Sequence, residues 1–142
     1  MISSNGIRLI KSFEGFSPTV YPDSAGLPTV GIGHLIKTGE FFPDPITEAE
    51  AETILQRDLS RTIQAVSRLI RSPLNQNQRD SLISWTFNNG GGSLQGSTLR
   101  MVLNREEYDE APDQMRRWVY AGGRKLRGLV IRREIEARLF AS

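Results

Sequence analysis

The segment between Thr47 and Ile70 is the feature that most constrains the fold. Thr47 can cap a helix, and Glu50, three residues later, completes a capping box. Apolar residues then recur at helical spacing as far as Ser72-Pro73; they are Ile54, Leu55, Leu59, Ile63, Val66, Leu69 and Ile70. A helix of more than twenty residues is long for a chain of 142 residues. It predicts a spine that joins two lobes of one domain.

The segment before this helix predicts a short helix and a small sheet. A first helix should follow the capping residues Ser3 to Asn5 and end at Glu14, because Gly15 is a natural stop. Strands are predicted at Thr19–Tyr21 and Thr29–Ile32, with a turn between them, and a third short strand near Leu35–Lys37. We expect these strands to pair in antiparallel order.

The remainder of the chain predicts helices. Their expected ranges are Asn75–Phe87, Ser97–Asn104, Tyr108–Tyr120 and Leu126–Phe140, separated by glycine-rich breaks at 88–92 and 121–123. The expected architecture is therefore α+β and mostly helical. One domain spans residues 1–142, with a sheet-bearing lobe at about 14–58 and a helical lobe at about 59–142 on which helix 1–13 packs.

Composition excludes several kinds of chemistry. The chain has no cysteine and a single histidine, so disulfides, thiolate catalysis and a multi-histidine zinc site are excluded. We expect no metal and no cofactor. The first residues lack the apolar core of a signal peptide, and no window has the length of a membrane span. We therefore expect cytosolic synthesis and no stable membrane insertion.

Charge is distributed unevenly along the chain. The net charge is only +2, but basic residues outnumber acidic ones by six after Gln114. The basic residues there are Arg116, Arg117, Arg124, Lys125, Arg127, Arg132, Arg133 and Arg138, opposed by Glu134 and Glu136. An anionic partner is one interpretation. A solvated helix face is the other, and it is the commoner meaning of such a run.

The stretch from Glu14 to Leu35 carries the candidate chemistry. Glu14 is followed after eight residues by Asp23 and after five more by Thr29, and then by the sequence VGIGHL. This register resembles family 24 of the glycoside hydrolases, the phage-type lysozymes. Further similarities are the long helix, the sequence FNNG at 87–90, AGG at 121–123 and the paired arginines Arg132-Arg133. The resemblance covers nearly the whole chain and implies a lysozyme-like fold.

The resemblance implies roles for three residues. Breaking a glycosidic bond needs an acid for the leaving oxygen and a carboxylate that activates water on the opposite face of the sugar. Glu14 corresponds to the acid, and Asp23 and Thr29 to the residues that hold the water. Inversion is implied, with carboxyl groups separated by roughly 6.5–9.5 Å. Taken singly, each residue has a plainer reading as a surface carboxylate, a turn former or a packed strand residue.

The resemblance also implies supporting and substrate-binding residues. His34 should pair with Asp58 of the long helix and tether the sheet to it. A C-terminal arginine should lie beside Glu14, with Arg127 the first candidate and Arg132 the second. The positions that match substrate-lining residues of the family are Leu35, Phe87, Ser97, Thr98 and Gln114.

The implied activity is hydrolysis of the β-1,4 bond between N-acetylmuramic acid and N-acetylglucosamine in bacterial peptidoglycan. Such an enzyme would act as a monomer on the cell wall at the end of a phage cycle, after a holin releases it from the host cytoplasm. A lytic transglycosylase and a non-catalytic wall-binding relative are alternatives. A nucleic-acid-binding helical domain is a third, but it leaves Glu14, Asp23 and Thr29 unexplained and shows no helix-turn-helix spacing.

Overall fold

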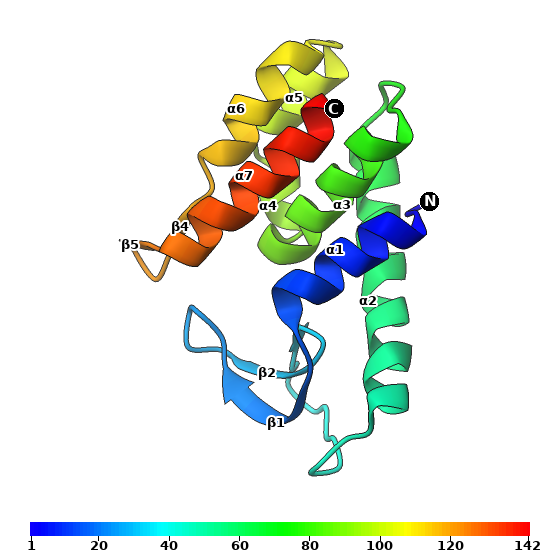
Figure 1. Ribbon diagram of the computed structural model, residues 1–142, viewed down its shortest axis with the longest axis vertical. Helices are drawn as coiled ribbons and strands as arrows, with labels where there is room; N and C mark the ends of the chain where they lie inside the picture. The colour runs from blue at the N-terminus through cyan, green and yellow to red at the C-terminus, as the bar shows by residue number, and fades with distance from the viewer.

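The computed structural model describes residues 1–142. A small sheet lies at one end of the molecule and most helices at the other (Figure 1). The elements in chain order are α1 (Ser4–Glu14), β1 (Ser17–Pro22), β2 (Pro28–Gly31), β3 (His34–Leu35), α2 (Glu48–Leu69), α3 (Gln76–Asn89), α4 (Gly91–Gln95), α5 (Thr98–Asn104), the 3-10 turn η1 (Tyr108–Glu110), α6 (Ala111–Arg116), β4 (Tyr120–Ala121), β5 (Arg124–Lys125) and α7 (Arg127–Ala141). The predicted α+β class, mostly helical with a small antiparallel sheet, is confirmed.

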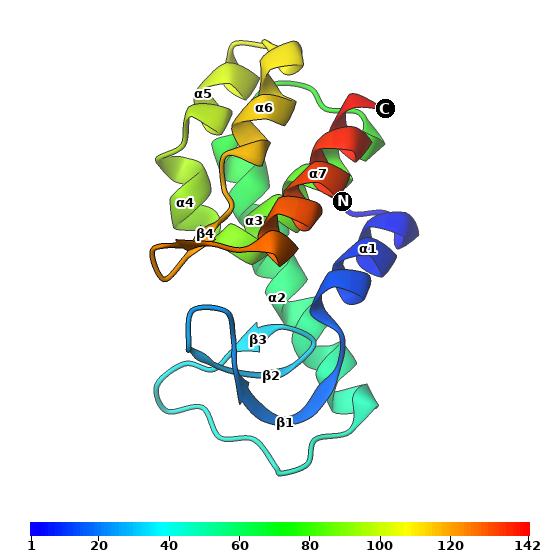
Figure 2. The same ribbon diagram turned by 60° about the vertical axis from the view of Figure 1, so that its left-hand side comes forward.

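Helix α2 is the long element that the sequence predicts, and it runs from the sheet into the helical part (Figure 2). Its capping box is present: the Glu50 backbone N–H donates to Thr47 Oγ1 at 3.1 Å, and the Thr47 N–H donates to Glu50 Oε1 at 3.1 Å. Helix α2 contacts β2 and β3 near its start and α3 and α4 further along. It therefore fixes the sheet relative to the helices.

The sheet is antiparallel, with strand order β1-β2-β3. Tyr21 lies opposite Thr29, and Val30 lies opposite His34. The third strand occupies His34–Leu35, slightly earlier than the sequence predicts. Because the buried Val30 joins the same core as Leu55 of α2, the sheet and the helices share one hydrophobic core.

Helix α3 is the centre of the helical part. It packs against α1, α2 and α7, and Trp85 on it is fully buried. Its surface is buried on several sides, which explains why Ser84 and Asp80 on this helix are also buried. Helices α1 and α7 both pack on this helix, and its start contacts both ends of the chain: Gln76 Nε2 donates to the Met1 carbonyl and Asn77 Nδ2 to Ser142 Oγ. No helix is both long and apolar enough to cross a membrane.

The predicted helix Tyr108–Tyr120 is wrong in its last four residues, 117–120. Helix α6 ends at Arg116, and a two-stranded hairpin, β4–β5, follows. Gly122 and Gly123 both have positive φ values, 57° and 76°, which glycine adopts without strain. The hairpin closes where the Leu126 N–H donates to the Val119 carbonyl at 3.0 Å. The glycines at 91–92, expected in a break, instead begin the short helix α4.

Candidate active site

Glu14 is the last residue of α1, and Gly15 ends the helix with a φ of 65°. The Glu14 side chain is 17% exposed, and its Oε2 accepts a hydrogen bond from Arg132 Nη1 at 2.7 Å. The Arg132 guanidinium also lies over the Phe13 ring, 4.6 Å from its centroid. Glu14 is therefore a partly buried carboxylate with one oxygen held by a cation.

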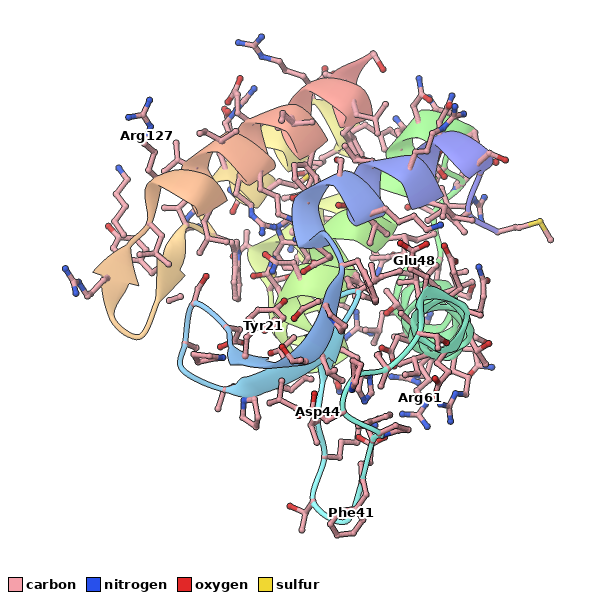
Figure 3. The ribbon with its side chains drawn as sticks, turned by 60° about the horizontal axis from the view of Figure 1, so that its bottom comes forward. Tyr21, Phe41, Asp44, Glu48, Arg61 and Arg127 are labelled. Atoms are coloured by element: carbon pink, nitrogen blue, oxygen red, sulfur yellow. The ribbon has the colours of Figure 1, made fainter.

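The arginine beside Glu14 is Arg132, not Arg127, which was the first candidate from sequence. Arg127 is the first residue of α7 and points into solvent (Figure 3). Five residues later, Arg132 lies on a different face of the helix, where it is buried against α3. Both arginines fit a basic C-terminal helix, but only the second faces α1.

A buried ionic network continues from this arginine. Arg132 Nε donates to Glu136 Oε2 at 3.2 Å, and its Nη2 donates to the Ser84 carbonyl at 3.2 Å. Arg133 Nη1 donates to Glu136 Oε1 at 2.8 Å, and its Nη2 donates to Asn88 Oδ1. Burial raises the pKa of Glu136 and lowers the pKa of Arg133 to about 10. Sequence reasoning did not assign Glu136 a role, although its spacing from the two arginines places all three within one helical turn.

Gly33 gives Glu14 the space that it occupies. A Cβ atom at Gly33 would lie 2.6 Å from Glu14 Oε1, and the φ of 69° is one that glycine accepts without strain. The backbone of the loop between β2 and β3 thus lies directly against the oxygen of Glu14 that Arg132 does not bind. A glycine is required here by both the space and the conformation.

Asp23 and Thr29 are oriented by one backbone unit, that of Leu27. Asp23 Oδ1 accepts hydrogen bonds from the backbone N–H groups of Ala25 at 2.9 Å and Leu27 at 2.8 Å. Thr29 Oγ1 donates to the Leu27 carbonyl at 3.1 Å, and this carbonyl also accepts from the Asp23 N–H. Oδ2 of Asp23 has no protein donor, so it is free to accept a hydrogen bond from a bound molecule.

Tyr21 is influenced by the charges of both carboxylates, and sequence reasoning missed it. Tyr21 lies on β1 (Figure 3), and the strand register places it directly opposite Thr29. Burial is the main cause of its raised pKa, and the negative charges of Glu14 and Asp23 raise it further. The phenol is therefore close enough to both carboxylates to sense their charge. An aromatic residue two positions before Asp23 was the only available sequence signal.

His34 makes the contact that the sequence predicts. It is buried, and its Nδ1 lies 2.8 Å from Asp58 Oδ2. A second carboxylate, Glu40, was not predicted; its Oε1 lies 3.1 Å from His34 Nε2. The backbone N–H of Lys37 is the main cause of the lowered pKa of Glu40, and His34 contributes. These contacts join β3, α2 and the intervening loop behind the site.

The predicted substrate-binding residues lie in different environments. Leu35 is 46% exposed at the end of β3, and Thr98 is exposed at the start of α5. Phe87 is half-buried against the core, and Gln114 is half-buried and accepts from Arg117 Nη1 at 3.1 Å. Leu35 and Thr98 are thus accessible to a ligand, whereas Phe87 and Gln114 are so only in part.

Ser97 departs from the sequence-based expectation. It is 4% exposed and caps α5: its hydroxyl accepts from the Arg100 N–H at 3.0 Å and donates to the Leu94 carbonyl at 2.8 Å. Both functions of the hydroxyl are therefore used within the protein. No set of three or more histidine or acidic side chains is placed to hold a metal ion.

Comparison with known proteins identifies the family. The sequence profile of the phage lysozyme family matches residues 11–136. The chain belongs to this family.

Individual relatives match over nearly their whole length. The endolysin of Salmonella phage P22 is 41% identical over 144 residues, which covers 99% of this chain and 98% of the relative. The muramidase domain of SpmX from Asticaccaulis excentricus is 32% identical with a TM-score of 0.87, covering 100% of this chain and 98% of that one. The endolysin from Escherichia coli O157:H7 phage FAHEc1 is 34% identical with a TM-score of 0.85, covering 99% and 92%.

Proposed function

We propose that this protein is an endolysin that hydrolyses the β-1,4 bond between N-acetylmuramic acid and N-acetylglucosamine in bacterial peptidoglycan. Family membership and the identity to the P22 endolysin support a glycoside hydrolase of the lysozyme class. The observation that carries the proposal is the presence of two carboxylates, Glu14 and Asp23, in contrasting environments. One carboxylate is partly buried beside a cation, and the other is held in a turn with an oxygen free.

Glu14 is the general acid in this proposal. Arg132 binds its Oε2, so the proton for the leaving glycosidic oxygen resides on Oε1, which lies against Gly33. The Arg132 guanidinium stabilises the carboxylate that remains after the proton is transferred. Arg132 thus leaves one oxygen of Glu14 for the proton before bond cleavage and stabilises the carboxylate after it.

Asp23 and Thr29 hold the attacking water. The hydroxyl proton of Thr29 is committed to the Leu27 carbonyl, so Thr29 offers only acceptor lone pairs to a water molecule. A water that donates one hydrogen to Thr29 and the other to Asp23 Oδ2 directs its own lone pair at the anomeric carbon. Asp23 takes the proton as the water adds, and its charge stabilises the cationic transition state. Attack from the face opposite the leaving group inverts the anomeric configuration.

The biological setting follows from the same proposal. Peptidoglycan is anionic, so the basic C-terminal region favours the encounter. The enzyme acts as a monomer at the cell wall, and a holin or a similar lesion releases it from the host cytoplasm. Expression in a bacterial host tests this staging: lysis should follow only when the inner membrane is permeabilised. A single species of monomer mass in light scattering tests the oligomeric state.

The decisive experiment is digestion of purified peptidoglycan, followed by mass spectrometry of the released muropeptides. The wild type is compared with Glu14→Gln and with Glu48→Gln, a charge-matched control on the exposed first turn of α2. We expect reducing N-acetylmuramic acid ends from the wild type and the control, and a loss of about 100-fold or more in Glu14→Gln. Anhydro-muramic ends would instead identify a lytic transglycosylase, and binding without release would identify a wall-binding protein.

A further inference from the structure

Glu136 is a fully buried carboxylate with no part in the mechanism described above. Its Oε2 accepts hydrogen bonds from Arg132 Nε at 3.2 Å and from the Ser84 hydroxyl at 2.6 Å. Its Oε1 accepts from Arg133 Nη1 at 2.8 Å. A buried carboxylate is costly unless it is paired, so the question is what this pairing does for the protein.

The answer lies in the guanidinium that Glu136 shares. Arg132 presents Nη1 to Glu14 and Nε to Glu136, so one cation binds two carboxylates through different nitrogens. The side chains of Arg132 and Glu136 are only 6% and 0% exposed. Charges interact strongly in such a poorly solvated place. Each carboxylate therefore weakens the hold that the cation has on the other.

We propose that Glu136 is a positioning residue for catalysis, which fixes Arg132 against Glu14 and offsets part of its charge. Without this offset, Arg132 would hold Glu14 as a carboxylate and weaken it as an acid. With it, the guanidinium is anchored and the net positive charge that Glu14 faces is reduced. The inference rests on the proposed role of Glu14 as the general acid.

The other charged groups around the pair leave this balance intact. Arg133 is the second cation of the network, so two arginines face two glutamates on α1 and α7. The sheet contributes Tyr21 and Asp23, and neither contacts Arg132. The charged groups of α6 pair on another face of α7, where Arg116 binds both Asp113 and Glu134.

The first test is Glu136→Gln, which keeps the shape and removes the charge. The loss of a nearby negative charge favours the ionised form of Glu14, so the alkaline limb of the pH–activity profile should move to lower pH by about one unit. Glu134→Gln is the matched control, because Glu134 lies on the same helix but binds Arg116 and Arg138. We expect its alkaline limb to coincide with that of the wild type.

The second variant guards against loss of the fold. Removing one member of a buried ion pair is strongly destabilising, whereas removing both is often tolerated. The double variant Arg133→Met with Glu136→Gln removes a cation and an anion together. The limb should still move to lower pH, by less than in the single variant, because Glu136 is bonded to the guanidinium on Glu14 and Arg133 is not.

A direct titration separates this inference from the proposed function. The carboxyl carbon-13 signal of Glu14, identified by its absence in Glu14→Gln, is followed against pH in the wild type and in each variant. Its midpoint should fall when Glu136 loses its charge, whether or not the protein cleaves peptidoglycan. Midpoints that stay unchanged, or that rise, in folded Glu136→Gln or in the double variant would overturn the inference.

Discussion

Arg132 donates a hydrogen bond to Glu14 across 118 positions of sequence and so joins the last helix to the first at the proposed catalytic acid. The same guanidinium bonds to Glu136 and to the Ser84 carbonyl. Three helices, α1, α3 and α7, therefore meet at one side chain. The position of Glu14 depends on the docking of α7 as much as on α1 itself.

Arg132→Lys tests this dependence. Lysine keeps the charge but lacks the planar fork, so it cannot bond to all three partners from their present positions. We expect the free energy of unfolding to fall by about 2–3 kcal/mol and kcat/KM to fall at least tenfold. Urea denaturation and peptidoglycan turnover measure the two effects.

Arg138→Lys is the control for this substitution. Arg138 lies on the same helix, its side chain is 77% exposed, and it binds Glu134. Its replacement should change stability by no more than about 0.5 kcal/mol. If the two lysine variants lost equal free energy of unfolding, the buried contacts of Arg132 would contribute no more to stability than those of a surface ion pair.

The choice between Arg127 and Arg132 shows what sequence alone leaves open. Both belong to the predicted C-terminal helix, and the family resemblance requires only that one of them reach Glu14. Two positions that are five residues apart lie on different faces of a helix. Which of the two arginines reaches Glu14 therefore depends on how α7 is rotated against α3. That rotation is set by tertiary packing, which no local pattern records.

Other features of the fold and the site also differ in whether local sequence signals predict them. The long helix α2 and its capping box were predictable, because caps and apolar spacing are local signals. The organisation of Asp23 and Thr29 by Leu27 was not, because it uses backbone groups that every residue has. The predicted helix Tyr108–Tyr120 fails at residues 117–120 because Gly122 and Gly123 permit a tight hairpin with positive φ values.

Gly33→Ala should damage the site directly. The added methyl group would lie 2.6 Å from Glu14 Oε1, and alanine would be strained at a φ of 69°. We expect activity to fall about 100-fold because the acid is displaced from its reactive position. The strain should also lower the free energy of unfolding by about 1–2 kcal/mol.

Gly39→Ala separates strain from displacement. Gly39 has a φ of 86°, and no atom lies within 4 Å of an added Cβ. Gly39→Ala should lose as much free energy of unfolding as backbone strain costs in Gly33→Ala. It should keep the activity of the wild type. Equal activity in the two variants, measured per folded molecule, would show that Gly33 does not set the position of Glu14.

Tyr21 should report the charge of the proposed catalytic acid. Burial raises its pKa first, and the negative charges of Glu14 and Asp23 raise it further. Glu14→Gln removes one of these charges, so the pKa of Tyr21 should move down toward the ordinary value of 10. Phenolate absorbance follows the titration, and Tyr21→Phe identifies which of the three tyrosines is Tyr21.

The control for this titration is Glu48→Gln on α2, whose charge is not among the causes of the raised pKa. It should leave the phenolate titration of Tyr21 where it is in the wild type. A Tyr21 titration that responds equally to both substitutions would mean that the phenol senses net charge rather than the site.

The hairpin β4–β5 presents unpaired cations beside the turn that carries Asp23, and the two lie side by side in Figures 1 and 2. Arg124 and Lys125 are exposed and take part in none of the ion pairs. Attraction to an anionic wall should therefore act close to the site. The double variant Arg124→Gln with Lys125→Gln should lower kcat/KM about threefold to tenfold at low salt. The deficit should shrink as the ionic strength approaches about 0.5 M.

Arg57→Gln with Arg61→Gln removes the same net charge from α2. Both residues are exposed and unpaired, and Arg61 lies across the molecule from Arg127 at the base of the hairpin (Figure 3). If attraction near the site matters, this control should lose less than twofold at low salt, because the attraction between charges weakens with their distance. Equal losses in the two double variants would assign the effect to net charge, and the hairpin would then have no special role in binding the wall.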